Sequence, residues 1–277
     1  HAGLQYILGN EAKLDALLAE SDKLAPNNTT SLQTAAMLLE MKTQREAAVR
    51  LLKTVIERAP WETGARHLLG DIYLNDGMDE EATAVLNEAY AFDPYNVKTV
   101  NYIRLLEDLA KYEKVTTEHL VLYYDRDLDP ITADQIGPFM ERTYEDVTKI
   151  FDYTPKTKVI VQVYPDDAEF SVRMAGVPGI ENYGVSFGRV LATVAPRAGT
   201  KKGNFNWARV LRHEFVHTIN LLATKERCPR WLTEGLAVWQ EGVPFRFDGV
   251  APLNEAGPAE AGALLPHISA GGIPPTP

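Results

Sequence analysis

Apolar residues in the first part of the chain recur at helical spacing, and the pattern itself repeats. The segments EAAVRLLKTVIERAP and EEATAVLNEAYAFDP superimpose, and their final prolines, Pro60 and Pro94, are 94 − 60 = 34 residues apart. A further step of the same length back along the chain reaches Pro26. Each unit has the pattern of a helix pair whose apolar face only a neighbouring pair can cover. Residues 1–112 are therefore predicted to form an N-terminal α-solenoid.

Small and helix-breaking residues support this division into units. Ala48 and Ala82 occupy equivalent positions, where a small side chain lets the two helices of a unit approach closely. The proline at the end of each unit stops the second helix. Residues 1–26 supply only one helix in this pattern, so the chain is predicted to begin inside a repeat, truncated at its start.

The pattern changes after Lys114, where β-rich runs alternate with helical stretches. This order predicts a small α+β domain over residues 113–250. Residues 251–277 hold many Gly, Pro and Ala residues and are predicted to form an irregular, truncated tail. Strands are predicted at 116–124, 158–164 and 185–195, and helices at 132–152, 166–175, 207–222 and 230–241.

Composition narrows the classes of partner and site. The chain of 277 residues carries a formal net charge of −10, which disfavours nucleic acid as a partner because phosphate binding requires clustered Lys and Arg. No apolar run approaches the length of about 18 residues that a membrane span requires, so none is predicted. The single cysteine, Cys228, excludes an internal disulfide and any CxxC metal site.

Candidate chemistry is concentrated in the helix predicted at 207–222, which contains His213-Glu214-Phe215-Val216-His217. Residues four apart lie on one face of a helix, so both imidazoles are expected to point to one spot, as two ligands of a tetrahedral zinc ion do. Glu214 is expected beside the open coordination position. There it can take a proton from water, whose pKa zinc lowers towards about 7.

A third ligand is expected from the segment that follows this helix. Glu234 lies 234 − 217 = 17 positions after the second histidine, which is enough for a loop and a returning helix. Its neighbours Gly235 and Ala237 are small, so the returning helix can pack closely against the first. Glu234 is the predicted ligand, and the competing candidates are Glu226, Glu241 and Cys228.

The helical units resemble the tetratricopeptide repeat. The resemblance covers about residues 1–112, and Arg66 stands where that family usually has an early Trp. It implies a groove that binds a peptide or a partner protein, and a role as spacer or lid for the second domain is the alternative. The residues that match the order and spacing of the family are Leu69, Gly70, Tyr73, Ala82, Ala89 and Pro94.

The sequence HEFVH, followed by WLTEGLA at 231–237, resembles the gluzincin branch of zinc metallopeptidases over about residues 115–242. The resemblance implies a zincin-like fold in which His213, His217 and Glu234 bind Zn²⁺. It implies that Glu214 is the general base and later the proton donor. It also implies that an edge strand near 183–195 pairs with an extended peptide or protein substrate. The resemblance points to the bacterial cell envelope.

Two features depart from this family. Larger gluzincins place an acidic residue shortly after the third ligand to orient a histidine, and this chain has the apolar stretch 236–239 there. No clear later helix supplies a Tyr or His that stabilises an oxyanion, and Tyr183 and His267 are the candidates for that role. The predicted function is a zinc-dependent metallopeptidase. The alternative is a repeat-based adaptor whose zinc-binding module is inactive.

Overall fold

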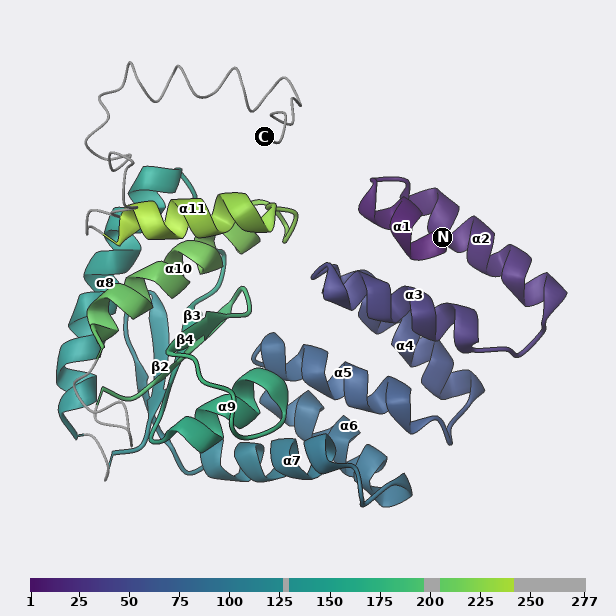
Figure 1. Ribbon diagram of the computed structural model, residues 1–277, viewed down its shortest axis with the longest axis horizontal. Coiled ribbons are helices and arrows are strands. Elements are labelled where there is room, and N and C mark those ends of the chain that lie inside the picture. The colour runs from purple at the N-terminus through teal and green to yellow at the C-terminus, as the bar shows by residue number, and fades with distance from the viewer. Residues whose placement is uncertain (127–129, 197–204, 242–277) are drawn as a thin grey trace, which may run out of the picture.

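The structure, a computed structural model, describes residues 1–126, 130–196 and 205–241, without the side chains of residues 130–133. Within these ranges it contains eleven helices and one five-stranded sheet. Seven helices come first, and the sheet with its four helices follows (Figure 1). The predicted combination of an α part and an α+β part is confirmed at this level. The predicted tail, residues 251–277, lies outside the described residues.

The N-terminal helices pack in pairs. They are α1 (Ala2–Ile7), α2 (Glu11–Leu24), α3 (Thr30–Met41), α4 (Arg45–Arg58), α5 (Thr63–Asn75), α6 (Asp79–Phe92) and α7 (Val97–Leu109). α3 packs against α4 and α5 against α6, and the two pairs contact each other. α4 and α6 begin 79 − 45 = 34 residues apart and end 92 − 58 = 34 residues apart, as the sequence period predicts. Ala48 and Ala82 are completely buried at their equivalent positions.

Residues 1–26 contain two helices, and the prediction of a single helix there is wrong. Gly9, with a φ of +86°, lies in the turn between α1 and α2. α1 packs against both α2 and α3. Its six residues are too few to display an apolar period, which is why the repeat pattern misses it.

The sheet is mixed and central to the second part of the chain. Its strands are β1 (Glu113–Thr116), β2 (Leu120–Tyr124), β3 (Val159–Tyr164), β4 (Gly184–Ser186) and β5 (Val190–Val194). The order is β1-β2-β3-β5-β4, in which β2, β3 and β5 are parallel and the two edge strands are antiparallel to their neighbours. Every residue of β3 and β5 is buried, so both faces of the sheet must be covered.

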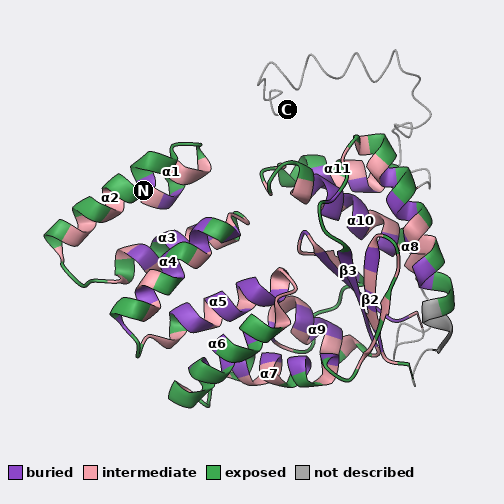
Figure 2. Cartoon of the chain, turned by 180° about the vertical axis from the view of Figure 1, so that it is seen from behind, coloured by how far each residue is buried: buried purple, intermediate pink, exposed green. Residues whose placement is uncertain are grey.

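Helices provide this cover. α8 (Pro130–Phe151) and α10 (Trp207–Ala223) pack on one face, and α11 (Arg230–Gln240) packs on α10. α9 (Asp167–Ala175) contacts β3 and β5, and the turn between α5 and α6 contacts the same two strands through Gly77. Figure 2 shows buried strands between these layers and exposed residues on the outer helix faces.

Each of two predicted strands proves to be part of a hairpin. Residues 116–124 span the end of β1, a turn and β2, and residues 185–195 span most of β4, a turn and β5. The Phe187 amide donates to the Val190 carbonyl at 2.8 Å across a loop in which Gly188 has a φ of +94°. A loop of two residues is too short to interrupt a β-rich run, so the sequence reads as one strand. Only β4 therefore lies at this edge of the sheet, and β5 is an interior strand.

A buried arginine joins the repeats to the sheet. Arg173 on α9, which is 1% exposed, donates from Nε to Gln162 Oε1 of β3 at 2.9 Å. Its two terminal nitrogens donate to Asn75 Oδ1 and to the Leu74 carbonyl of α5, both at 3.0 Å. The guanidinium also lies over the ring of Phe187, 4.1 Å from its centroid. One side chain thereby bonds the helical part to the α+β part.

The segment after α9 covers the surface of α7. The Asn101 side chain of α7 donates to the Gly176 carbonyl at 2.9 Å, and a side chain at position 176 would touch Lys98 and Tyr102. Part of the surface of α7 is therefore occupied by the same chain, and the groove that the repeat resemblance implies stays a prediction. None of the helices in the described ranges combines the length and apolar character needed to cross a membrane.

Arg173→Met is expected to lower the free energy of unfolding by about 2–4 kcal/mol, because it leaves buried acceptors on β3 and α5 without their charged donor. Arg104→Met, on an exposed position of α7, is the control and should change it by no more than about 0.5 kcal/mol. Urea unfolding followed by circular dichroism measures both. Equal effects of the two substitutions would show that the Arg173 contacts do not stabilise the junction.

Candidate metal centre

Helix α10 places two histidines on one face. Asn206 caps the helix, because its side-chain oxygen accepts a hydrogen bond from the Arg209 backbone amide at 3.1 Å. Leu211 and Phe215 are completely buried and fix the opposite face. His213 and His217, one turn apart, bring their Nε2 atoms to 3.0 Å from each other.

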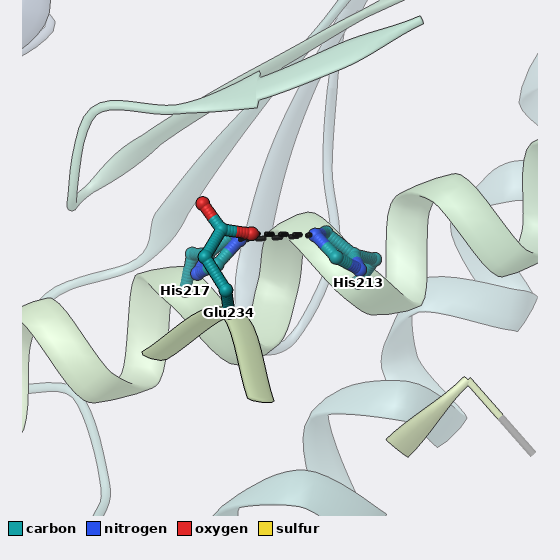
Figure 3. Close-up of side chains that lie close together, drawn as sticks. All are labelled: His213, His217 and Glu234. Carbon is teal, nitrogen blue, oxygen red and sulfur yellow. Dashed lines mark hydrogen bonds and ion pairs between the residues drawn. The ribbon is translucent and has the colours of Figure 1, made fainter. Parts of the chain in front are cut away.

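Helix α11 brings a carboxylate to this pair. Glu234 Oε2 lies 3.7 Å from His213 Nε2 and 3.4 Å from His217 Nε2, and the three side chains point toward one another (Figure 3). The structure thus brings together the three residues that the sequence selects. Ala237 is completely buried, in agreement with close helix packing, whereas Gly235 faces open space and does not contribute to it.

The spacing of the three ligand atoms fits a tetrahedral zinc ion. Zinc lies about 2.0–2.1 Å from imidazole nitrogen and carboxylate oxygen, so two such atoms at the tetrahedral angle are about 3.3 Å apart. The separations here are 3.0, 3.4 and 3.7 Å. In the part of the chain that the structure describes, this is the one group of His, Cys, Asp or Glu side chains placed to hold a metal ion. Three protein ligands leave a fourth position for water, which is typical of catalytic sites.

Both imidazoles are oriented by α11 through Nδ1. His213 Nδ1 lies 2.7 Å from Glu241 Oε1, and His217 Nδ1 lies 2.8 Å from Thr233 Oγ1. Arg209 forms an ion pair with the same Glu241 carboxylate and holds it in place. An acceptor at Nδ1 keeps the proton on that nitrogen and leaves the Nε2 lone pair for a metal.

Glu241 is a residue whose role the sequence does not reveal. It appears there only as a competing third ligand, and the orienting acid is sought in the apolar stretch 236–239. Glu241 follows Glu234 by 241 − 234 = 7 residues, which is two helical turns, so both carboxylates lie on the α10 side of α11. This spacing is the signal that could have identified it. The other competitors lie outside the ligand group: Glu226 binds Arg45 at 2.9 Å, and Cys228 lines the adjacent cleft.

Glu214 faces the same cleft without joining the ligand group. It is 9% exposed and lies beneath β4, where a Cβ at Gly184 would come within 2.8 Å of Glu214 Cγ. The backbone amide of Ser186 donates to its carboxyl group. Burial, and then the neighbouring Glu234 carboxylate, raise the pKa of Glu214 to about 8. A cation held by the three ligands would oppose this rise.

Burial also sets the protonation of a ligand. Burial and, after it, the neighbouring His213 imidazole lower the pKa of His217 to about 4. His217 is therefore neutral near pH 7, which is the form that binds a metal.

The ligand group opens into a cleft of about 910 Å³. One wall is β4, a second is formed by α10, α11 and the loop between them, and a third comes from the repeats. Tyr183, a candidate for oxyanion stabilisation, packs against Phe205 with tilted rings whose centroids are 4.8 Å apart, and it is not among the residues that line the cleft. His267, the other candidate, lies outside the described residues.

No model of a protein family matches the sequence, and no curated protein matches it significantly.

Glu241→Ala is expected to weaken zinc binding by about 10- to 100-fold, because His213 loses the acceptor that orients it. Glu241→Gln keeps an acceptor oxygen without its charge and should have an intermediate effect. Competition with a chromophoric chelator measures the affinity. Glu118→Ala, at a carboxylate that is 83% exposed and distant in the sequence, is the control and should bind zinc as tightly as the unchanged protein. Zinc affinity that is unaffected by Glu241→Ala would contradict the assignment.

Proposed function

We propose that this protein is a zinc-dependent metallopeptidase of the gluzincin type, in which His213, His217 and Glu234 bind Zn²⁺ and Glu214 acts on water. The observation that carries the proposal is the placement of Glu214. It is buried beneath β4 and lines the cleft of the three ligands without being one of them. A site that served only to stabilise the fold would have no use for a further acidic side chain at this position.

Zinc would supply polarisation of the scissile carbonyl and would lower the pKa of the attacking water. The chain itself would handle the protons. Glu214 takes a proton from the water and delivers it to the departing amine, so that one carboxyl group serves as base and then as acid. Burial favours the protonated form of this carboxyl group, and a bound cation would favour its ionised form, so that both forms would be available for the two roles.

The free edge of β4 supports a peptide as the substrate. The Tyr183 carbonyl accepts from the Val194 amide at 3.3 Å, and the Phe187 amide donates to Val190. Alternate residues of β4 thus bond β5, and the backbone groups of Gly184 and Ser186 face away from the sheet. The Ser186 amide is used by Glu214, which leaves Gly184 to bond the backbone of an extended substrate.

The predicted substrate strand is therefore shorter than the sequence suggests. Residues 190–194 belong to the interior strand β5, so the edge available for pairing is Gly184–Ser186. Pairing along this edge brings a peptide bond past the ligand group, because β4 packs directly on α10. The edge that would bind the substrate is therefore next to the residues that would bind zinc.

Glu214→Gln is expected to keep zinc and to lower peptide hydrolysis by at least about 100-fold, because the amide cannot accept the proton from water. Metal content by atomic emission and cleavage of a mixed peptide library are measured on the same preparation. His217→Ala is the companion variant and should lose both metal and activity. Hydrolysis at the original rate by Glu214→Gln would rule out the proposed base. A zinc-loaded protein that cleaves no peptide would favour the alternative of an adaptor with an inactive zinc module.

A further inference from the structure

We infer that the helical repeats form a substrate-binding wall of the metal cleft, and that Met41 binds a large apolar side chain of an extended substrate. The repeat wall consists of Ile7 and residues 41–44, which line the same cleft as the three ligands. The inference rests on the proposed peptidase function, since it names the kind of substrate that the site would take.

The repeat wall is bonded to the loop that joins the two ligand helices. Thr43 Oγ1 donates to the Glu226 carbonyl at 3.0 Å, and Gln44 Nε2 donates to the Lys225 carbonyl at 3.3 Å. Residues 224–229 link α10, which holds both histidines, to α11, which holds Glu234. The repeat wall is therefore hydrogen-bonded to the segment that connects the ligand helices, and these bonds define its position relative to the ligands.

A buried guanidinium connects the cleft walls. Arg45, which is 7% exposed, contacts Glu226 Oε1 at 2.9 Å and Asp76 Oδ1 at 3.1 Å, and donates to the Phe187 carbonyl at 2.7 Å. Phe187 lies in the turn between β4 and β5, directly after the strand edge. One side chain of α4 thus bonds both the strand wall and the loop beside the ligands. These charge-assisted bonds, all from Nη1 of Arg45, connect the strand wall and the loop beside the ligands to the same helix of the repeats.

The chemistry of the repeat wall indicates what it binds. Met41 is the last residue of α3. Its side chain is large and apolar, and yet the residue is 72% exposed. Ile7 on the repeats and Leu221 on α10 line the cleft with it and are only partly buried. A flexible thioether beside two aliphatic side chains favours a large apolar group of variable shape.

The opposite wall determines the shape of the substrate. Gly184 of β4 lines the cleft with its backbone groups directed away from β5, and in this proposal those groups bond an extended chain. The volume of about 910 Å³ is at the upper end of the range for ligand pockets, which suits a short peptide segment. An extended, unfolded segment with an apolar side chain directed at Met41 satisfies both walls.

Met41→Glu tests this contact, with Met37→Glu as its matched control. Both methionines lie on α3 and are exposed, Met37 at 57%, but only Met41 lines the cleft. In hydrolysis of a library of short peptides by the zinc-loaded full chain, Met41→Glu should raise KM about ten-fold with kcat unchanged. Met37→Glu should leave both constants unchanged, and Met41→Leu should retain the original KM.

Binding measured without turnover separates this inference from the proposed function. Fluorescein-labelled peptides of the same library are titrated with the zinc-loaded Glu214→Gln protein, and fluorescence anisotropy gives the Kd. If adding Met41→Glu raises the Kd about ten-fold and adding Met37→Glu does not, the result supports the repeat wall. This holds even if the unchanged protein hydrolyses no peptide. Absent hydrolysis would contradict only the peptidase proposal. Equal Kd values for the two variants, or no binding of any peptide, would overturn the inference.

Discussion

The site depends on how helix α11 is rotated and positioned against helix α10, which is called the register of the two helices below. α11 supplies Glu234 to the ligand group and also supplies Thr233 and Glu241, the acceptors that hold the two imidazoles through Nδ1. Turning α11 by one residue, about 100°, would remove the carboxylate and both acceptors together. Five side chains therefore depend on one helix–helix contact. Their arrangement follows from backbone packing, which is more rigid than the conformations of long side chains.

This register is held from outside the helix pair. The loop between α10 and α11 is bonded to the turn after α3, and Arg45 connects that loop to the hairpin that carries β4. On the far side of the sheet, Arg173 bonds α9 and β3 to α5. Two buried arginines thus attach the repeats to the α+β part, and both contact Phe187 in the turn between β4 and β5. Because separating the parts would leave both buried guanidinium groups without their acceptors, the repeats serve as a scaffold for the cleft.

Local features of the fold and the site are readable from the sequence, and contacts between distant segments are not. The spacing of His213 and His217 lies within one helical turn, so helix geometry alone predicts their convergence. The 34-residue period likewise reflects a contact that recurs between neighbouring units. The hairpin at Gly188 is missed because a loop of two residues leaves no break in a β-rich run. Arg45 has no sequence signal, because its partners lie up to 226 − 45 = 181 positions away.

The surroundings of Glu214 are unfavourable to the fold, and the proposed function accounts for them. A carboxyl group that is 9% exposed and lies near the Glu234 carboxylate has lost most of its hydration and experiences repulsion when ionised, as its raised pKa indicates. An apolar side chain of similar size beneath β4 would avoid both costs. Position 184, where any Cβ would approach Val210 and Glu214, adds a glycine that weakens the edge strand. A peptidase needs both features, since the carboxyl group must reach water beside the ligands and the strand must admit a substrate close to it. Gly184 and Glu214, which lower the stability of the fold, are therefore the residues that would bind the substrate and transfer the proton.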